Sequence, residues 1–242
     1  MPKMAASLNT RQAVDNSQGN RFHFQEATRI QQSLLAPLER RCLRWLASGM
    51  PSWVVPDTLT VLGLFAMLMG GLSYALARYS PVWLWVVNFW LAVNWFGDSL
   101  DGTLARYRNR LRPRYGFYVD HMMDAIGSLF LIGGLALSGL ISESIAMGVL
   151  IGFLLLMIDS YLAAHTIRRF NISFGKFSPT EMRILLAIGN AFACIKPFVT
   201  FLGARRLFFD AACGIAIIGM GVFLIVSVSI NTATLYKAER LD

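Results

Sequence analysis

Long apolar segments separated by short basic connections constrain this sequence more than any other feature. Apolar residues make up 55% of the chain and charged residues 15%, and the mean hydropathy is +0.52. A soluble domain usually carries about 25% charged residues, so this composition favours an integral membrane protein. Apolar segments of about 20 residues match the thickness of the hydrocarbon core when they are helical. The sequence therefore predicts an all-α integral membrane protein.

The pattern predicts six transmembrane helices preceded by a cytoplasmic amphipathic helix. The six spans are expected at about residues 58–77, 82–97, 116–138, 144–164, 179–202 and 207–235. In residues 21–55, Leu, Ile and Trp alternate with Arg, which is typical of one or two helices, broken near Pro37, on an anionic membrane surface. A packed surface helix is the alternative. We expect residues 1–20, which lack the apolar core of a signal peptide, to be disordered, and residues 56–242 to form the six-helix membrane domain.

The basic residues predict the orientation of the chain. All but four of the 22 lysines and arginines precede the first span, follow the last, or lie around the second-to-third and fourth-to-fifth connections. The exceptions are Arg78, Lys196, Arg205 and Arg206. The positive-inside rule makes the basic face cytoplasmic, so both termini and the residues between spans two and three are expected there, at a cytoplasmic or inner membrane. The net charge of +8 then reflects loops facing anionic headgroups, and no nucleic-acid partner is expected.

Four aspartates at helical spacing flank the connection between the second and third spans. Asp98 and Asp101 are three residues apart, and Asp120 and Asp124 are four apart, so each pair falls on one helix face. Carboxylates near membrane depth need a partner, and a hard divalent cation prefers oxygen ligands. Two such ions can clamp both oxygens of a phosphoryl displacement. Ion pairs with the arginines of residues 106–114 are the alternative, which explains four clustered carboxylates less well.

This window resembles the signature of the CDP-alcohol phosphotransferase family. That signature reads D-x-x-D-G-x-x-A-R, a spacer, then G-x-x-x-D-x-x-x-D, and the chain matches every specified position. The matching residues are Asp98, Asp101, Gly102, Ala105, Arg106, Gly116, Asp120 and Asp124, with a spacer of nine residues. The resemblance implies a six-helix membrane enzyme, usually a homodimer, in phospholipid biosynthesis. Such an enzyme transfers a phospho-alcohol from a CDP-linked donor to a lipid or small-alcohol acceptor and releases CMP.

The resemblance also implies a role for each aspartate. Asp98, Asp101 and Asp120 would bind a pair of Mg²⁺ or Mn²⁺ ions. Asp124 would complete the metal site and act as the general base that takes the proton of the acceptor hydroxyl. This agrees with elementary chemistry, since a positioned carboxylate is a suitable acceptor for that proton.

The remaining matched residues are implied to bind the nucleotide. Gly102, Ala105 and Gly116 leave the helix surface bare, so they would admit the cytidine moiety. Arg106 would support the nucleotide or its pyrophosphate through charge-assisted hydrogen bonds. The segment P-D-T-L-T, which opens the first span, is similar to a P-N-x-x-T segment of many family members. Asp57 or Thr60 in this segment is a candidate nucleotide contact, and a helix N-cap is the alternative.

His121 directly follows Asp120, and the resulting D-H-x-x-D form is similar to the choline/ethanolamine phosphotransferase branch. In that branch the histidine is thought to help activate the acceptor, so His121 is a second candidate catalytic residue. The branch also carries a Glu after the motif glycine, where this chain has Phe117. A histidine at the headgroup level without a catalytic role is the alternative.

One polar segment outside the window leaves a further alternative. Ser178-Pro179-Thr180-Glu181 has the pattern of a capping box with Pro at the first helical position. The alternative is an acceptor-binding corner, because Lys176 and Arg183 flank the segment.

Two directions of transfer remain open from the sequence. Either CDP-diacylglycerol gives a phosphatidyl group to a small alcohol, or a CDP-linked small alcohol gives its phospho-headgroup to a lipid. An ion-coupled transporter using intramembrane carboxylates is the rival function, which predicts flux without release of CMP. The position of the acids at the cytoplasmic edge counts against it, and a non-catalytic scaffold leaves the four aspartates without a role.

Overall fold

The computed structural model describes residues 28–30, 35–167, 169–171 and 178–240, and within them the fold is almost entirely helical. The seven helices are α2 (Ala36–Gly49), α3 (Pro56–Leu76), α4 (Trp83–Tyr107), α5 (Pro113–Leu137), α6 (Glu143–Thr166), α7 (Pro179–Ile195) and α8 (Phe208–Ala238). The four short strands are β1 (Thr28–Ile30), β2 (Arg169–Asn171), β3 (Phe198–Phe201) and β4 (Ala204–Leu207). The predicted all-α class is confirmed. Residues 1–20, predicted to be disordered, lie outside the described residues.

Four helices in the described part of the chain are long and apolar enough to cross a membrane, namely α3, α5, α6 and α8. This agrees with an integral membrane protein. The predicted second and fifth spans are also helices, α4 and α7, but neither belongs to this group. Helix α7 has only 17 residues, and α4 carries two of the four window aspartates, Asp98 and Asp101, within its length.

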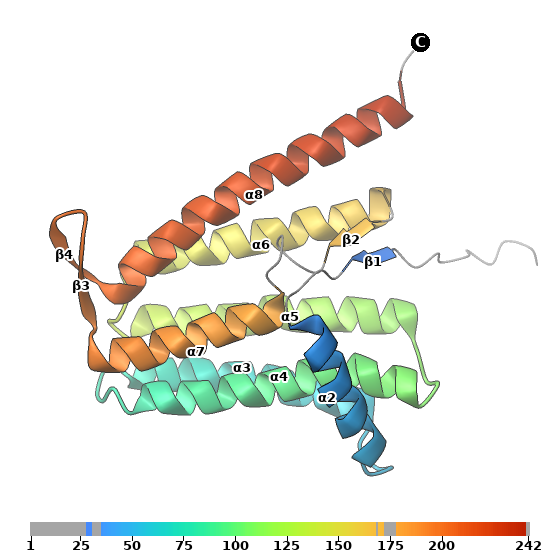
Figure 1. The fold of residues 1–242 in the computed structure, drawn as a ribbon, viewed down its shortest axis with the longest axis horizontal. Helices are drawn as coiled ribbons and strands as arrows, with labels where there is room; N and C mark the ends of the chain where they lie inside the picture. Colours follow the sequence, from blue (N-terminus) through green and yellow to red (C-terminus); the bar gives the residue numbers. More distant parts are fainter. Residues whose placement is uncertain (1–27, 31–34, 168, 172–177, 241–242) are drawn as a thin grey trace, which may run out of the picture.

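The long helices lie side by side with α3 at the centre of the contacts, and α2 crosses them near one end (Figure 1). Helix α3 packs against α4 and α5, and α7 packs against α4. Helix α6 lies between α5 and α8, and α8 diverges from the bundle toward its C-terminus (Figure 1). A buried polar chain ties three helices together, because Tyr74 donates to Asn190 at 2.7 Å and Asn190 donates to Asn88 at 2.7 Å. These contacts fix α3, α4 and α7 relative to one another.

Glycines allow the backbone of α3 to approach its two neighbours. A Cβ atom built on Gly134 of α5 would overlap the carbonyl oxygen of Gly71 in α3. A Cβ atom on Gly97 of α4 would lie 2.6 Å from the carbonyl oxygen of Leu59 in α3. Small residues allow this close packing where membrane helices cross. Because Gly97 directly precedes Asp98, the second contact holds the first aspartate of the window against α3.

We expect Gly134→Ala to destabilise the protein strongly, because its methyl group meets backbone rather than a movable side chain. Overpacking of this kind costs about 3 kcal/mol. The neighbouring Gly133 is a matched control, since a Cβ atom there meets nothing within 4 Å, and alanine in a helix is favoured over glycine by about 1 kcal/mol. Thermal unfolding in detergent should show a lower midpoint for Gly134→Ala and an unchanged or higher one for Gly133→Ala. Equal midpoints would contradict the close α3–α5 contact.

Two local predictions were wrong. The fifth span was expected to continue to residue 202, but α7 ends at Ile195 and a hairpin of β3 and β4 follows. Its turn consists of Leu202 and Gly203, both with positive φ, and the mirror-image turns of two-residue hairpins need this backbone conformation.

In the N-terminal segment, residues 28–30 were expected to be helical but form β1, which pairs in parallel with β2. The single helix α2 contains Pro37 in its first turn, where proline is tolerated and does not break the helix.

Candidate active site

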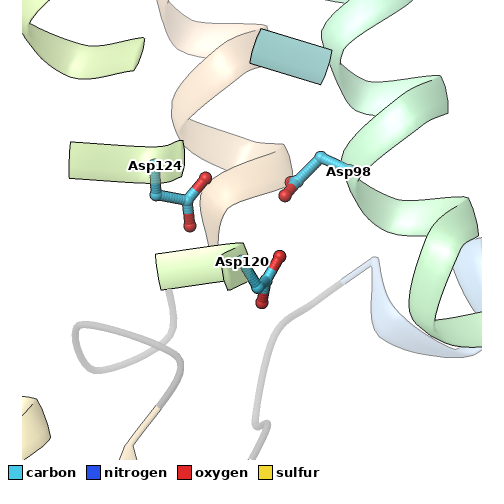
Figure 2. Close-up of side chains that lie close together, drawn as sticks. All are labelled: Asp98, Asp120 and Asp124. Carbon is cyan, nitrogen blue, oxygen red and sulfur yellow. The ribbon is translucent and has the colours of Figure 1, made fainter. Parts of the chain in front are cut away.

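Three of the four window aspartates converge from α4 and α5, two helices that both pack against α3. Carboxylate oxygens of Asp98, Asp120 and Asp124 all lie within 4.8 Å of one another. Figure 2 shows Asp98 facing Asp120 and Asp124 across the gap between the two helices. Helix α4 continues through the window to Tyr107, as the three-residue spacing predicted, and Asp120 and Asp124 lie one turn apart on α5.

A small cleft opens beside these carboxylates, with an empty volume of about 260 Å³ that includes open solvent. Its lining comes from α3, α4 and α5: Thr60, Gly63, Leu64, Met67, Asn94, Asp98, Asp120, Met123 and Asp124. Asn94 closes the α3–α4 side by donating its Nδ2 to the carbonyl oxygen of Gly63 at 3.0 Å. The cleft therefore combines a carboxylate wall with an apolar wall.

Asp101, the fourth predicted metal ligand, lies one turn further along α4 and is buried. Its Oδ2 accepts a hydrogen bond of 2.6 Å from Oγ1 of Thr60, and its Oδ1 accepts the backbone N–H of Gly102 at 2.5 Å. The segment at the start of α3 and the window thus meet through the Thr60–Asp101 pair. Thr60 also lines the cleft. Its hydrogen bond therefore connects the Asp101 carboxylate to the cleft that the other three aspartates line.

Arg183 of α7 is a component of the site that the sequence did not predict in this role. Its Nη2 lies 2.5 Å from Oδ2 of Asp98, and its Nε donates to Oδ1 of Asn94 at 2.8 Å. The side chains of Arg183 and Asp98 are only 16% and 20% exposed. Among the described residues, Nη1 of Arg183 is the only buried side-chain nitrogen or oxygen without a hydrogen-bond partner. A buried donor without an acceptor is costly and is suited to an anion.

We expect Arg183→Met to lower the free energy of unfolding of the metal-free protein by about 3 kcal/mol, since it leaves Asp98 largely buried beside two other carboxylates. Arg183→Lys keeps the charge but not the planar fork, so it should show a smaller loss. Thermal unfolding in the presence of a chelator measures both variants. If Arg183→Met unfolds at the wild-type temperature, the pairing with Asp98 does not stabilise the protein.

Four of the predicted nucleotide-contacting residues lie in the last turns of α4 and the first turn of α5, on either side of the connection between these helices. Gly116 is exposed, and a Cβ atom there would meet nothing within 4 Å, so its surface is bare as predicted. Gly102 and Ala105 are half-buried. Arg106 is exposed and folds back along α4, with Nη2 3.5 Å from Oγ1 of Thr103. None of these four residues lines the cleft itself.

Asp57 does not cap α3, which was the alternative to a nucleotide contact. The backbone N–H of Val55 instead donates to Oγ1 of Thr58 at 3.1 Å. Asp57 forms an ion pair with Arg112, the residue that precedes α5. This hydrogen bond raises the pKa of the Arg112 guanidinium above its ordinary value, and the guanidinium also lies over the ring of Tyr115 at 4.2 Å. Asp57 therefore links the starts of α3 and α5 at the rim of the site.

His121 turns toward an aromatic cluster rather than into the cleft. Its ring stacks on Phe117 with centroids 4.2 Å apart and meets the edge of Tyr161 at 4.8 Å. Its Nδ1 lies 2.6 Å from the carbonyl oxygen of Phe117. Because a carbonyl oxygen only accepts, Nδ1 carries the proton in this contact. The same nitrogen lies 3.7 Å from Oδ2 of Asp120, so His121 is a neighbour of one carboxylate of the cluster.

The segment that opens α7 has the capping box that the sequence predicted. Oε2 of Glu181 accepts the backbone N–H of Ser178 at 2.9 Å and also the Ser178 hydroxyl. Oε1 of Glu181 accepts the backbone N–H of Leu35, just before α2, at 3.1 Å. The structural interpretation of this segment is confirmed, and the capping residue also binds the start of α2.

Comparison with known proteins agrees with this site. The sequence model of the CDP-alcohol phosphatidyltransferase family matches residues 53–218, which include every residue of the cleft. The chain is 31% identical over 172 residues to a CDP-diacylglycerol–serine O-phosphatidyltransferase of Encephalitozoon cuniculi, covering 68% of this chain and 42% of the relative. It is 25% identical to an archaetidylinositol phosphate synthase of Pyrococcus horikoshii, covering 70% and 84%. It is 27% identical to human cholinephosphotransferase 1, covering 64% and 40%. The chain thus spans less than half the length of the first and third relatives.

Proposed function

Because the chain belongs to the CDP-alcohol phosphatidyltransferase family, a family of transferases for substituted phosphate groups, we propose that it is a phospholipid-synthesising transferase. In this reaction an acceptor hydroxyl attacks a phosphorus of a CDP-linked donor, the bond to the CMP oxygen breaks, and CMP leaves. The observation that carries the proposal is the convergence of Asp98, Asp120 and Asp124 beside the cleft. The spacing of these residues is the one that the family signature requires.

The donor set fits a pair of Mg²⁺ or Mn²⁺ ions. Three carboxylates lie within 4.8 Å of one another, and a fourth, Asp101, is held nearby by Thr60. Hard divalent cations take oxygen ligands, and close carboxylates repel one another without a cation. When bound, such ions neutralise the pyrophosphate and stabilise the departing CMP. We propose Asp98, Asp101, Asp120 and Asp124 as their ligands.

The residues of the chain would supply the remaining steps. Asp124, facing the cleft, takes the proton of the acceptor hydroxyl as that oxygen attacks phosphorus. The fork of Arg183, with its unpaired Nη1, is suited to a phosphate oxygen. His121 supports Asp120 from the aromatic cluster and would act on the acceptor only through a change of orientation.

The nucleotide would lie along the end of α4 and the start of α5, where small residues leave the helix surface bare. Gly102, Ala105 and Gly116 leave room for the cytidine ring, and Arg106 binds the nucleotide or its pyrophosphate. At the start of α3, Thr60 orients Asp101, and Asp57 is a further candidate contact to the nucleotide. Supporting this placement, Thr60 lines the cleft, and Gly102, Ala105 and Arg106 follow Asp101 in the last turns of α4.

The membrane arrangement that we propose has six spans, with α4 and α7 joining the four longer apolar helices. Residues 56–242 then form the catalytic membrane domain, and residues 21–55 the amphipathic segment on the cytoplasmic surface. The active site and both termini face the cytoplasm, in agreement with the distribution of basic residues. A homodimer is the proposed assembly, and the uncovered surface of α8 is available to lipid or to a second copy.

A panel of substrates tests the proposed reaction. The purified protein in lipid vesicles is incubated with Mg²⁺ or Mn²⁺ and each of several donors, including CDP-diacylglycerol, CDP-choline and CDP-ethanolamine, with lipid and small-alcohol acceptors. Mass spectrometry should detect a new phospholipid with one donor class, which decides the direction of transfer. The named relatives include both directions, since one name gives CDP-diacylglycerol as donor and another gives cholinephosphate as the transferred group. No product from any pair would contradict the proposal.

A further inference from the structure

A glutamate on the inner side of α2 is bound by two helices of the active site. Oε1 of Glu39 accepts hydrogen bonds from Nε1 of Trp95 at 2.9 Å and from Oγ1 of Thr180 at 2.5 Å. The Oγ of Ser99 lies 3.5 Å from the same oxygen. Trp95 and Ser99 belong to α4, and Thr180 lies in the first turn of α7. One carboxylate oxygen therefore joins α2, α4 and α7.

The donors to Glu39 are close neighbours of residues in the site. Ser99 follows Asp98 in α4, and Thr180 precedes Arg183 by three residues, or about one turn of α7. Asp98 and Arg183 are the two side chains that close the α4–α7 contact at the cleft. Glu39 joins the same two helices through its bonds to Trp95, Ser99 and Thr180, so its position affects how Asp98 and Arg183 meet.

The outer side of α2 complements a negatively charged membrane surface. Leu38 and Trp45 are 68% and 74% exposed. All three arginines of the helix are exposed as well: Arg40, Arg41 and Arg44. Glu39 is the only acidic residue of the helix, and it faces inward. A surface with three cations, two large apolar side chains and no acid fits anionic headgroups over an apolar boundary.

We propose that Glu39 is a positioning residue that couples the attachment of α2 to an anionic membrane surface to the geometry of the active site. The inference rests on the proposed transferase function and adds a lipid-dependent control to it. With α2 seated on the surface, the Glu39 carboxylate holds α4 and α7 at the spacing in which Arg183 reaches Asp98. When α2 leaves the surface, the three donors lose their common acceptor and the spacing of α4 and α7 changes. The fraction of molecules with a catalytically competent active site then falls.

Activity in vesicles of defined composition tests the coupling. CMP release is compared in phosphatidylcholine vesicles and in vesicles with about 30 mol% phosphatidylglycerol, an anionic lipid to which exposed arginines bind. Wild type should turn over faster on the anionic vesicles. Glu39→Ala should lose between about tenfold and a hundredfold in kcat, since small displacements of catalytic groups have effects of this size, and it should no longer respond to the anionic lipid. Glu39→Gln keeps an oxygen that accepts the same hydrogen bonds, so it should restore most of both properties.

Removal of an acid elsewhere provides the matched control. Glu143→Ala removes an exposed glutamate from the first turn of α6, away from α2 and the cleft, and should behave as wild type. A Glu39→Ala enzyme with wild-type kcat and wild-type lipid response would overturn the coupling. A wild-type enzyme that is indifferent to anionic lipid would also overturn it.

Two measurements without turnover separate this inference from the reaction itself. Cys42 is exposed on α2, so an environment-sensitive dye on Cys42, with Cys194 and Cys213 replaced by Ser, reports the seating of the helix. Its emission should shift to the blue on anionic relative to neutral vesicles. Hydrogen exchange in the first turn of α7 should be faster in Glu39→Ala than in Glu39→Gln. If wild type releases no CMP, the proposed function fails, while an unchanged dye emission or equal exchange overturns the role of α2 and Glu39.

Discussion

Asp124→Asn is expected to abolish CMP release while leaving the protein folded. The substitution keeps the size of the side chain and removes both its charge and its ability to take a proton from the acceptor hydroxyl. Loss of a general base costs between about 10² and 10⁴ in rate, and the loss of one of the converging carboxylates weakens metal binding in addition. The rate of CMP release per enzyme, measured with saturating donor and acceptor, gives the size of the effect.

An aspartate at the other end of the bundle is the control for Asp124→Asn. Asp210, in the first turn of α8, accepts hydrogen bonds of 2.6 Å from the backbone N–H and the hydroxyl of Ser142. Asp210→Asn should therefore retain activity. Thermal unfolding of both variants separates loss of chemistry from loss of fold. Full activity of Asp124→Asn would remove Asp124 from the role of base.

Removal of divalent metal is expected to have an equally large effect. A chelator should abolish activity, and Mg²⁺ or Mn²⁺ should restore it, because the clustered carboxylates need a cation to hold a pyrophosphate beside them. Binding to the folded state alone also stabilises it, by about 2.7 kcal/mol at a metal concentration one hundred times the Kd. The unfolding temperature of wild type should thus rise with added metal.

Variants of the aspartate cluster make the metal prediction specific. Asp98→Asn and Asp120→Asn each remove a carboxylate of the group that lies within 4.8 Å, so their unfolding temperatures should respond less to added metal than that of wild type. Asp210→Asn, remote from the cluster, should respond as wild type does. Full activity after exhaustive chelation, or an equal response in all variants, would argue against a metal site at these residues.

Local spacing was sufficient to predict the central part of the site. Asp98 with Asp101 and Asp120 with Asp124 have the separations of one helix face, and the helices through the window are continuous as expected. The bare helix surface at Gly116 was also predicted, and a Cβ atom there would meet nothing within 4 Å. Such features depend only on residues near one another in sequence.

The contributions from distant segments were not predictable in the same way. Arg183 lies 85 positions from Asp98 in the chain and reaches it only because α7 packs on α4. Glu39 lies 141 positions from Thr180. In both cases the sequence shows a charged residue on a helix but not its partner. The β3–β4 hairpin was missed for another reason, because Phe198, Val199 and Phe201 of β3 continue the apolar character of α7 beyond Lys196 and Pro197.

We propose that the protein transfers a phosphate-linked group from a CDP-alcohol at the cleft lined by Asp98, Asp120 and Asp124. The most direct measurement is the ratio of CMP released to phospholipid formed by the purified protein in vesicles with Mg²⁺ or Mn²⁺. We expect one CMP for each new lipid molecule in wild type, and neither product in Asp124→Asn. Metal-dependent ion flux across the vesicle without CMP release would contradict it and favour a transporter.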